Sequence, residues 1–542
     1  MSANPTLVTG QSLSSLDLIE SESHHPTVPV LPDLWVVKVG GASLGTVASL
    51  PAVIDGDREV SFTQLWSLIV RAAAAFTDAG LLAGDRMALW APNSLDWIVA
   101  CVGAQAVGAI VVPINTRLKG GEAAYILNRT RARFLVVSEP FLGVDYNAVL
   151  AAQPTPHLER TLSLGPDWEA FLAAAKPGAE IEARALAVRP EDACDIMFTS
   201  GTTGDPKGVI AGHAQSCRTF RSWVAKVGLR QGDRYLVVNP FFHSFGYKAG
   251  WLACLMAGAT IYPMKTFDVT HLIELVRTHR ITVLPGPPAI FQTLLASDLA
   301  GADLGSIRLS VTGAASIPPT LIERMRTDLG IESVLTGYGL TETCGVVSMS
   351  SAGDPADIVA RTCGKPIDGV EVRCIDGAGN PVPAGVEGEV VVRGFNVMQG
   401  YFEAPEATAE AIDAEGWLRT GDVGRLDEDG RLTITDRLKD MYISGGFNCY
   451  PAEIEKVLQR HPDVAFAAVI GVPDPRLGEV GKAFVAPVSG RTLDPDALLA
   501  WARENMANYK APRSVEVVAA LPLNAAGKVQ KFELRRIAKT KG

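Results

Sequence analysis

Hydrophobic and polar positions follow two rhythms along most of the chain. Residues 61–80, SFTQLWSLIVRAAAAFTDAG, carry apolar side chains three and four positions apart and end at a glycine, which predicts a helix. Residues 86–92, RMALWAP, are a short apolar run that predicts a strand. Similar runs occur at 132–138, 194–198, 208–212, 234–240, 281–287, 308–316 and 333–339, and helical spacing returns at 320–330. Alternating strands and helices predict layered α/β units with largely parallel sheets.

The longest apolar stretch is LDWIVACVGAQAVGAIVVPI, residues 95–114. Its length would suit a membrane span. Asp96 and Gln105 interrupt it, however, and its last six residues are β-branched like a strand. We therefore expect a core helix followed by a strand, and no integral membrane association.

The pattern changes after about residue 365. Short strands and turns predict a β subdomain over about 365–436. From about residue 440, helical patterns at 451–462 and 496–509 alternate with strand patterns at 466–473 and 482–488, which predicts a small α+β C-terminal domain. The first 30 residues are rich in Ser, Pro and acidic side chains and are expected to be disordered. The predicted plan is a large domain over 31–436 and a small one over 442–542.

Composition and charge narrow the class of protein. A chain of 542 residues exceeds what one hydrophobic core usually supports. A net charge of −10 argues against a nucleic-acid partner. The eight cysteines are scattered without a CxxC pair, which favours free thiols in a reducing compartment over disulfides or zinc. The N-terminus has no basic start or long apolar run, so we expect a cytoplasmic protein.

Residues 199–209, TSGTTGDPKGV, combine four hydroxyl side chains, three glycines and one lysine between two strand patterns. Such a loop can turn backbone N–H groups towards an anion, and a lysine adds a positive charge, so phosphate is the expected ligand. A P-loop is excluded because Pro206 precedes Lys207 and Gly208 follows it. A solvated turn is the alternative.

Four further stretches follow this loop in order: GYGLTET (337–343), WLRTGD (417–422), DRLKDMYISGGFNCYPAEIE (436–455) and PLNAAGKVQK (522–531). With these five motifs the chain resembles the adenylate-forming superfamily of acyl- and aryl-CoA ligases, firefly luciferase and peptide-synthetase adenylation domains. The resemblance covers nearly everything after residue 30. It implies a two-step reaction, in which a carboxylic acid and ATP give an acyl-adenylate and pyrophosphate, and coenzyme A then displaces AMP.

The resemblance also implies roles for particular residues in ATP binding. The phosphates would be held by the loop residues Thr199, Ser200, Gly201, Thr202, Thr203, Gly204 and Lys207. The adenine would lie near Gly313, Ala314, Ala315, Gly337, Tyr338 and Gly339. Thr341 would bond the α-phosphate region and Glu342 would help to hold Mg²⁺. Asp422 would accept from the ribose hydroxyls, with Arg437 beside it.

In the small domain, the resemblance makes Lys528 the catalytic lysine of adenylation. Lys439 takes the hinge position within 437–441, about which the small domain would swing between the two half-reactions. Gly445, Gly446 and Phe447 would then line the coenzyme A tunnel. By itself, a Gly-Gly pair indicates no more than a turn. Ala526 stands where the family commonly has Ser, and the GGFNC loop lacks a basic residue that some relatives carry.

The acid is expected to bind near residues 239–259, with Phe242, His243, Tyr247, Lys248 and Trp251 as the acyl pocket. His243 would be a catalytic gate or pocket wall, against the alternative of a structural histidine. Lys248 would point to solvent or meet a substrate oxygen, because an unpaired buried lysine is costly. The stretch FFHSFGYKAG resembles actinobacterial steroid-catabolic ligases that act on methylhexahydroindanedione propanoate, a bulky keto-acid.

Several alternatives stay open at this point. A fatty acyl- or aryl-CoA ligase, a ligase that loads a carrier protein, and a catalytically silent nucleotide-binding protein would share many of these motifs. The expected partners are a small carboxylic acid, ATP and coenzyme A. The sequence does not decide between a monomer and a homodimer.

Overall fold

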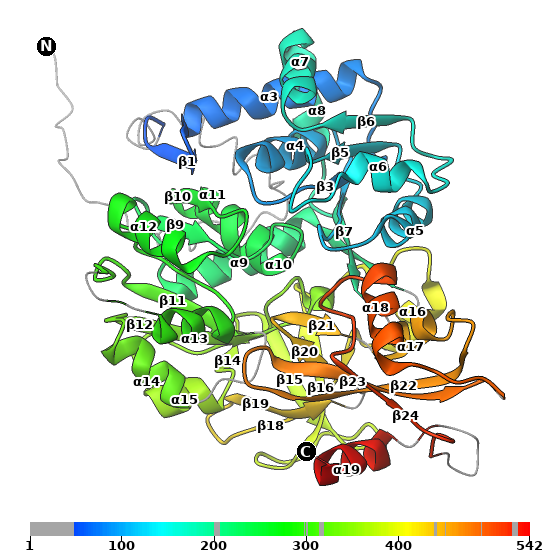
Figure 1. The fold of residues 1–542 in the computed structure, drawn as a ribbon. Helices are drawn as coiled ribbons and strands as arrows, with labels where there is room; N and C mark the ends of the chain where they lie inside the picture. Colours follow the sequence, from blue (N-terminus) through cyan, green and yellow to red (C-terminus); the bar gives the residue numbers. More distant parts are fainter. Residues whose placement is uncertain are drawn as a thin grey trace, which may run out of the picture.

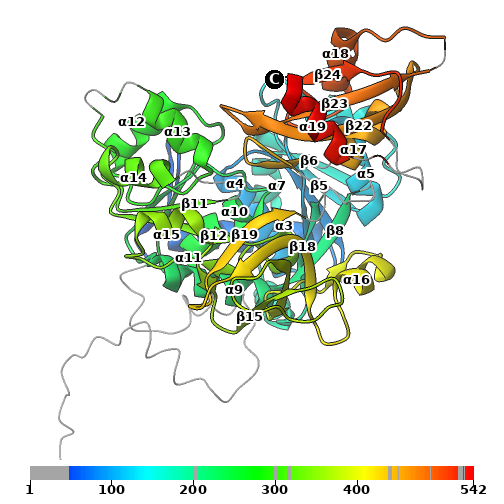
Figure 2. The ribbon, with the colours of Figure 1, turned by 90° about the horizontal axis from the view of Figure 1, so that it is seen from below.

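The computed structural model describes residues 48–199, 206–297, 299, 302–313, 319–437, 442–449, 451–488, 490–522, 529 and 531–541. The segment predicted to be disordered, 1–30, lies outside these ranges. Figures 1 and 2 show layered α/β units, a β subdomain and a small C-terminal unit that lies against them. This arrangement agrees with the predicted fold class.

A seven-stranded sheet carries the start of the predicted phosphate loop. Its order is β17 (Gly400–Tyr401), β8 (Lys207–Gly212), β7 (Ala193–Thr199), β4 (Ile110–Pro113), β3 (Arg86–Trp90), β5 (Phe134–Val137), β6 (Arg160–Ser163). The strands from β7 to β6 are parallel, whereas β8 is antiparallel to both of its neighbours. The carboxyl end of β7 therefore opens into the loop at a sheet edge where ligands commonly bind.

A second sheet has two four-stranded parts. One has the order β2 (Arg58–Ser61), β1 (Pro51–Asp55), β10 (Thr260–Pro263), β9 (Arg234–Val237), and the other β11 (Leu309–Gly313), β12 (Ser333–Tyr338), β13 (Ser348–Met349), β14 (Lys365–Pro366). Val283 joins them by single bridges to Tyr235 and Leu309. Residues 281–287, predicted to be a strand, thus form bridges only at Val283, because Pro285 and Pro287 have no N–H to donate.

The β subdomain and the small unit each contain one sheet in the described residues. The first has the order β15 (Val370–Ile375), β16 (Gly388–Gly394), β18 (Leu418–Leu426), β19 (Leu432–Arg437). The second has the order β21 (Phe447–Cys449), β20 (Tyr442–Ser444), β23 (Gly478–Pro487), β22 (Val464–Asp474), and β24 (Ser514–Val517) also pairs with β23.

Helices cover these sheets, and local sequence explains where several begin. Ser61 and Gln64 form a capping box that starts α3 at Phe62, and Ser94 caps α4. The apolar stretch 95–114 forms α4 and then β4, as predicted. The helices of the large part are α3 (Phe62–Asp78), α4 (Leu95–Ala106), α5 (Gly120–Thr130), α6 (Tyr146–Ala151), α7 (Pro166–Ala174), α8 (Ala179–Ala187), α9 (His213–Val227), α10 (Ser244–Gly246), the π-helix η1 (Tyr247–Leu252), α11 (Ala253–Ala257), α12 (Val269–His279), α13 (Pro288–Ala296), α14 (Pro319–Thr327), the 3₁₀ turn η2 (Thr341–Thr343), α15 (Ala356–Arg361) and α16 (Pro405–Ala411). Those of the small unit are α17 (Pro451–Leu458), α18 (Pro495–Asn505) and α19 (Lys531–Lys541).

The hydrophobic core of the large part consists of several clusters of buried residues. One cluster joins α3 and α4 to both large sheets and to the β subdomain. A smaller cluster packs around β3, β5 and α5 and includes Ala507, which belongs to the small unit and is fully buried. The two parts therefore share apolar contacts. Among the described residues, no helix has the length and apolar character needed to cross a membrane.

Candidate active site

Two antiparallel strands flank the loop that is predicted to hold phosphates. Thr199 ends β7 and Lys207 begins β8, and the two residues face each other in the register. A P-loop lysine opens a helix, whereas Lys207 opens a strand, so the structure agrees with the exclusion of that motif. The remaining predicted residues of the loop, Ser200, Gly201, Thr202, Thr203 and Gly204, lie outside the described ranges.

A carboxylate from a distant segment meets the start of this loop. Glu342 lies in η2, after β12, and its Oε1 accepts hydrogen bonds from the Thr199 hydroxyl at 3.4 Å and the Tyr401 hydroxyl at 3.0 Å. The Nζ of Lys207 lies 5.1 Å from the centre of the Tyr401 ring. Acid, hydroxyl and ammonium groups from three segments thus come together.

The environment of Glu342 suits a shared cation. Burial raises the pKa of its carboxyl, and the hydrogen bonds from Tyr401 and Thr199 oppose that rise. Among the described residues, no group of three or more His, Cys, Asp or Glu could hold a metal. Mg²⁺ commonly binds to one or two carboxylates and takes its remaining ligands from water and substrate phosphates. Glu342 beside a phosphate loop fits that donor set.

A second set of predicted residues meets where β11 and β12 end beside the middle of β18. The Tyr338 hydroxyl donates to the Asp422 carboxylate at 2.6 Å, and Asp422 is 2% exposed. Gly313 and Gly337 lie opposite each other in the register, so neither strand contributes a side chain at that point, although the Met349 side chain of β13 lies beside Gly337. Arg437 pairs with Asp422 across β18 and β19. An aromatic ring, a carboxylate and bare backbone offer the groups that a nucleoside needs.

A tight turn carries Thr341 and Glu342 from β12. A Cβ on Gly339 would lie 2.2 Å from the carbonyl oxygen of Gly345, so this position admits no side chain. The turn then closes with the N–H of Cys344 donating to the carbonyl of Thr341. Gly339 is therefore needed to fold the turn back and present both residues.

The loop with Phe242 and His243 is fixed from beneath. The Asn93 side chain donates to the carbonyls of Val237 and Asn239 and accepts from the N–H of Phe241. A Cβ on Gly246 would lie 2.3 Å from two carbonyl oxygens of this loop. His243 accepts the Phe245 N–H at Nδ1, and burial lowers the pKa of its imidazole, which favours the neutral form. Phe242 and His243 are both partly exposed, as the wall of a binding site requires.

Tyr247 and Trp251 differ from their predicted place in an open pocket. Their rings stack at 4.9 Å, and both pack edge-on against Trp97. The Tyr247 hydroxyl accepts from Gln105 at 2.7 Å. Since Tyr247 is 2% and Trp251 0% exposed, both belong to the core in this structure. They support the π-helix after His243 and do not face open space.

Lys248 also departs from the expectation. Its ammonium forms an ion pair with Asp195 of β7, at 2.9 Å and 3.1 Å from the two carboxylate oxygens. Lys248 is 1% exposed, so the alternative in which it points to solvent is wrong. A buried lysine is tolerated when its charge is paired, and Asp195 supplies that partner. The pair ties η1 to the strand that leads into the phosphate loop.

The predicted coenzyme A residues form a hairpin tip against the large part. Gly445 and Gly446 link β20 and β21 with φ of +56° and +83°, the conformation of a tight two-residue turn. A Cβ on Gly446 would lie 3.4 Å from Pro287. The Arg117 guanidinium lies 4.4 Å from the centre of the Phe447 ring. The structure therefore holds this hairpin at the large part.

Some predictions fall outside the described residues. These are Ala314, Ala315, the hinge residue Lys439 and the catalytic Lys528. Their roles stay predictions.

Tyr401 and Asp195 contact predicted site residues but were not themselves predicted from the sequence. Tyr401 lies in a two-residue strand that pairs with β8, far away in the sequence, and no local spacing links the two. Asp195 lies inside the apolar run CDIMF, and an acid in such a run was a usable signal, because a buried charge demands a partner.

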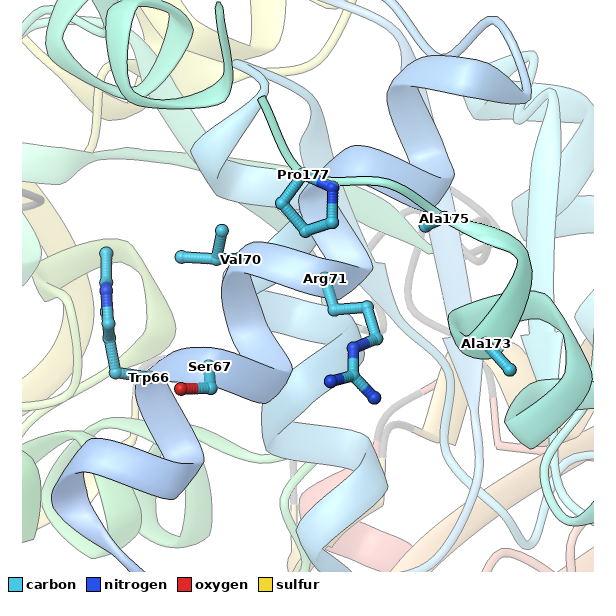
Figure 3. Close-up of a pocket in the computed structure, with 7 residues that line it drawn as sticks. All are labelled: Trp66, Ser67, Val70, Arg71, Ala173, Ala175 and Pro177. Atoms are coloured by element: carbon cyan, nitrogen blue, oxygen red, sulfur yellow. The ribbon is translucent and has the colours of Figure 1, made fainter. Parts of the chain in front are cut away.

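A surface hollow lies apart from these groups. It is lined by Trp66, Ser67, Val70 and Arg71 of α3 together with Ala173, Ala175 and Pro177 (Figure 3). Arg71 is its one charged side chain, and none of the predicted site residues lines it. The hollow therefore does not extend the candidate site.

Comparison with known proteins decides the family. The sequence profile of the AMP-binding enzyme family matches residues 45–402, and that of the AMP-binding enzyme C-terminal domain matches residues 453–528. The chain belongs to the AMP-binding enzyme family. It is 50% identical over 493 residues to a 7a-methyl-1,5-dioxo-octahydroindenyl-propanoyl:CoA ligase of Mycobacterium tuberculosis, across 90% of this chain and 95% of the relative. A ligase of the same name from Rhodococcus jostii is 48% identical over 501 residues, with the same coverage.

The fold of this chain is also similar to that of a solved CoA synthetase. A double mutant of o-succinylbenzoate CoA synthetase from Bacillus subtilis, bound with its product analogue, has a TM-score of 0.80 and 27% identity, over 94% of this chain and 99% of that one. The protein is thus an AMP-forming acid–CoA ligase, which uses ATP and coenzyme A as substrates with a carboxylic acid.

Proposed function

We propose that the acid is a bicyclic dione propanoate, the acyl group named for the two ligases above. The observation that carries this proposal is the identity of 50% and 48% over 90% of the chain. The sequence FFHSFGYKAG, chosen for its resemblance to such ligases, supports the same acid.

The roles in adenylation are assigned by the chemistry of the side chains and by the family resemblance. Lys207 and the loop after Thr199 would hold the phosphates of ATP, and Asp422 with Tyr338 would hold its nucleoside. Glu342 would hold Mg²⁺, which neutralises phosphate charge when bound. Lys528 would stabilise the charge that develops between carboxylate and α-phosphate, and Thr341 would bond that phosphate. Neutral His243, with Phe242, would border the reacting carboxylate.

Thioester formation is assigned to the hairpin tip of the small unit. Gly445 and Gly446 have no side chains to obstruct a pantetheine arm, and Phe447 lies beside them. The hinge at Lys439 would withdraw Lys528 and present the tip.

We further propose a cytoplasmic location, which eight free cysteines support, and a homodimer as the assembly to test by light scattering.

The deciding experiment is pyrophosphate release with ATP and Mg²⁺ across a panel of acids, with and without coenzyme A. The panel spans acetate, aromatic acids, straight fatty acids and the bicyclic dione propanoate. Selective turnover of the dione acid, dependent on coenzyme A, would support the proposal. Lys528→Ala should lower the adenylation rate by roughly 10²-fold or more. Equal or better turnover of straight fatty acids would overturn the assigned acid and leave the ligase class intact.

A further inference from the structure

Three charged side chains meet where α5 of the large part faces the small unit, on the side of the molecule that carries both α5 and α17 in Figures 1 and 2. The Lys510 ammonium donates to Glu122 of α5 at 3.0 Å and to Glu453 of α17 at 2.5 Å. Lys510 is 5% exposed. Glu453 and Lys510 both belong to the small unit, and Glu122 is the contribution of the large part.

Each group in this cluster is held in a defined place. Glu122 uses Oε1 to accept from Lys510 and Oε2 to accept the Lys119 N–H, which caps α5. Lys510 stays charged, because its two carboxylate neighbours and Tyr509 outweigh the burial that lowers its pKa. A charged donor between two carboxylates forms strong hydrogen bonds when water is largely excluded.

The neighbouring contacts fix the same relative orientation of the two parts. Asn115 donates to the Tyr509 hydroxyl at 3.1 Å, and the Tyr509 ring packs 4.6 Å from that of Phe447. Phe447 follows the Gly445–Gly446 turn that touches Pro287. The pairing of Lys510 with Glu122 and the seating of the hairpin at the large part therefore occur together.

We propose that Glu122 is a positioning residue that latches Lys510 and so favours the orientation used for thioester formation. The proposal rests on the acid–CoA ligase reaction and on the role assigned above to the hairpin tip. Glu122 touches no reacting atom. Breaking the latch should lower the population of the hairpin-seated orientation and should leave the adenylation site on the large part unchanged.

Glu122→Gln tests the latch with little cost to the fold. Glutamine at this third helical position can still accept the Lys119 N–H, as in other capping boxes, but it has no charge for Lys510. Acyl-adenylate is formed first without coenzyme A, and its pyrophosphate is measured. Coenzyme A is then added and thioester is followed over a single turnover. We expect unchanged or faster pyrophosphate release and roughly three- to tenfold slower thioester formation, the size expected for one partly buried ion pair.

Glu371→Gln is the matched control, because it removes an exposed carboxylate that pairs with Arg393 inside the β subdomain at 2.7 Å. It should leave both half-reactions unchanged. Equal slowing of both half-reactions by Glu122→Gln, or no slowing of the thioester step, would overturn the latch. Failure of the wild-type protein to form any thioester would instead count against the ligase assignment, so the two failures are distinct.

Discussion

The Tyr401 hydroxyl affects the pKa of the Glu342 carboxyl. Burial raises the pKa of Glu342, and the Tyr401 hydrogen bond opposes that rise. A carboxyl loses its charge as pH falls through its pKa, so the cation binding proposed for Glu342 would be lost on the acid side. Removal of the Tyr401 hydroxyl should raise this pKa further and move the loss to higher pH.

We therefore expect Tyr401→Phe to shift the acid limb of the kcat/KM profile for pyrophosphate release upward, with about a three- to tenfold loss on that limb and little change above it. Tyr146→Phe removes a hydroxyl that donates to the Thr116 carbonyl elsewhere in the large part and should leave the profile in place. A uniform loss at all pH values in Tyr401→Phe would contradict this explanation.

The Asp195–Lys248 pair makes a prediction about stability. Lys248→Met removes one partner of a buried ion pair and should cost about 3–5 kcal/mol in the free energy of unfolding. The double variant Asp195→Asn, Lys248→Met removes both charges and should recover much of that loss. Urea denaturation of the two variants and the wild type measures the difference. A double variant as unstable as the single one would contradict this prediction.

At the scale of elements, substitutions in the Gly445–Gly446 turn can distinguish the effect of backbone strain from that of a steric contact. Gly446→Ala forces a side chain into a positive φ and places its Cβ 3.4 Å from Pro287. Gly430→Ala meets a similar φ of +78° with no atom within 4 Å, so it is the matched control. We expect both variants to be about 1 kcal/mol less stable. Only Gly446→Ala should also slow thioester formation. Equal rates of thioester formation in the two variants would show that the hairpin has no role in that step.

The sequence predicted elements whose signals are local. The apolar spacing over 61–80 predicted the helix that the structure has at Phe62–Asp78, and the apolar stretch after Ser94 divides into α4 and β4 as expected. Contacts between distant segments were beyond reach, because spacing does not show which strands are neighbours. Tyr401 reaches Glu342 through a two-residue strand beside β8, and Lys248 finds its charge partner across the fold.

At the scale of the whole molecule, the thiols report on the integrity of the core. All eight cysteines are free, and seven are buried, while Cys363 is partly exposed. Burial raises the pKa of Cys363 to about 11, so its reactive thiolate is scarce at neutral pH. A chromogenic disulfide reagent should therefore react slowly with the native protein, at no more than about one thiol per chain, and with all eight after denaturation. Rapid native reaction of several thiols would contradict this packing.

The buried ion pair also constrains any exchange of substrate specificity between relatives. A chimera that receives residues 239–259 from a donor with an apolar side chain at position 248 would leave Asp195 in the core as an orphan charge. Such a hybrid would lose stability because of the orphan charge, whatever its new specificity. The residue at position 195 therefore has to be exchanged together with the transplanted segment, although 53 residues separate it from Lys248 in the sequence.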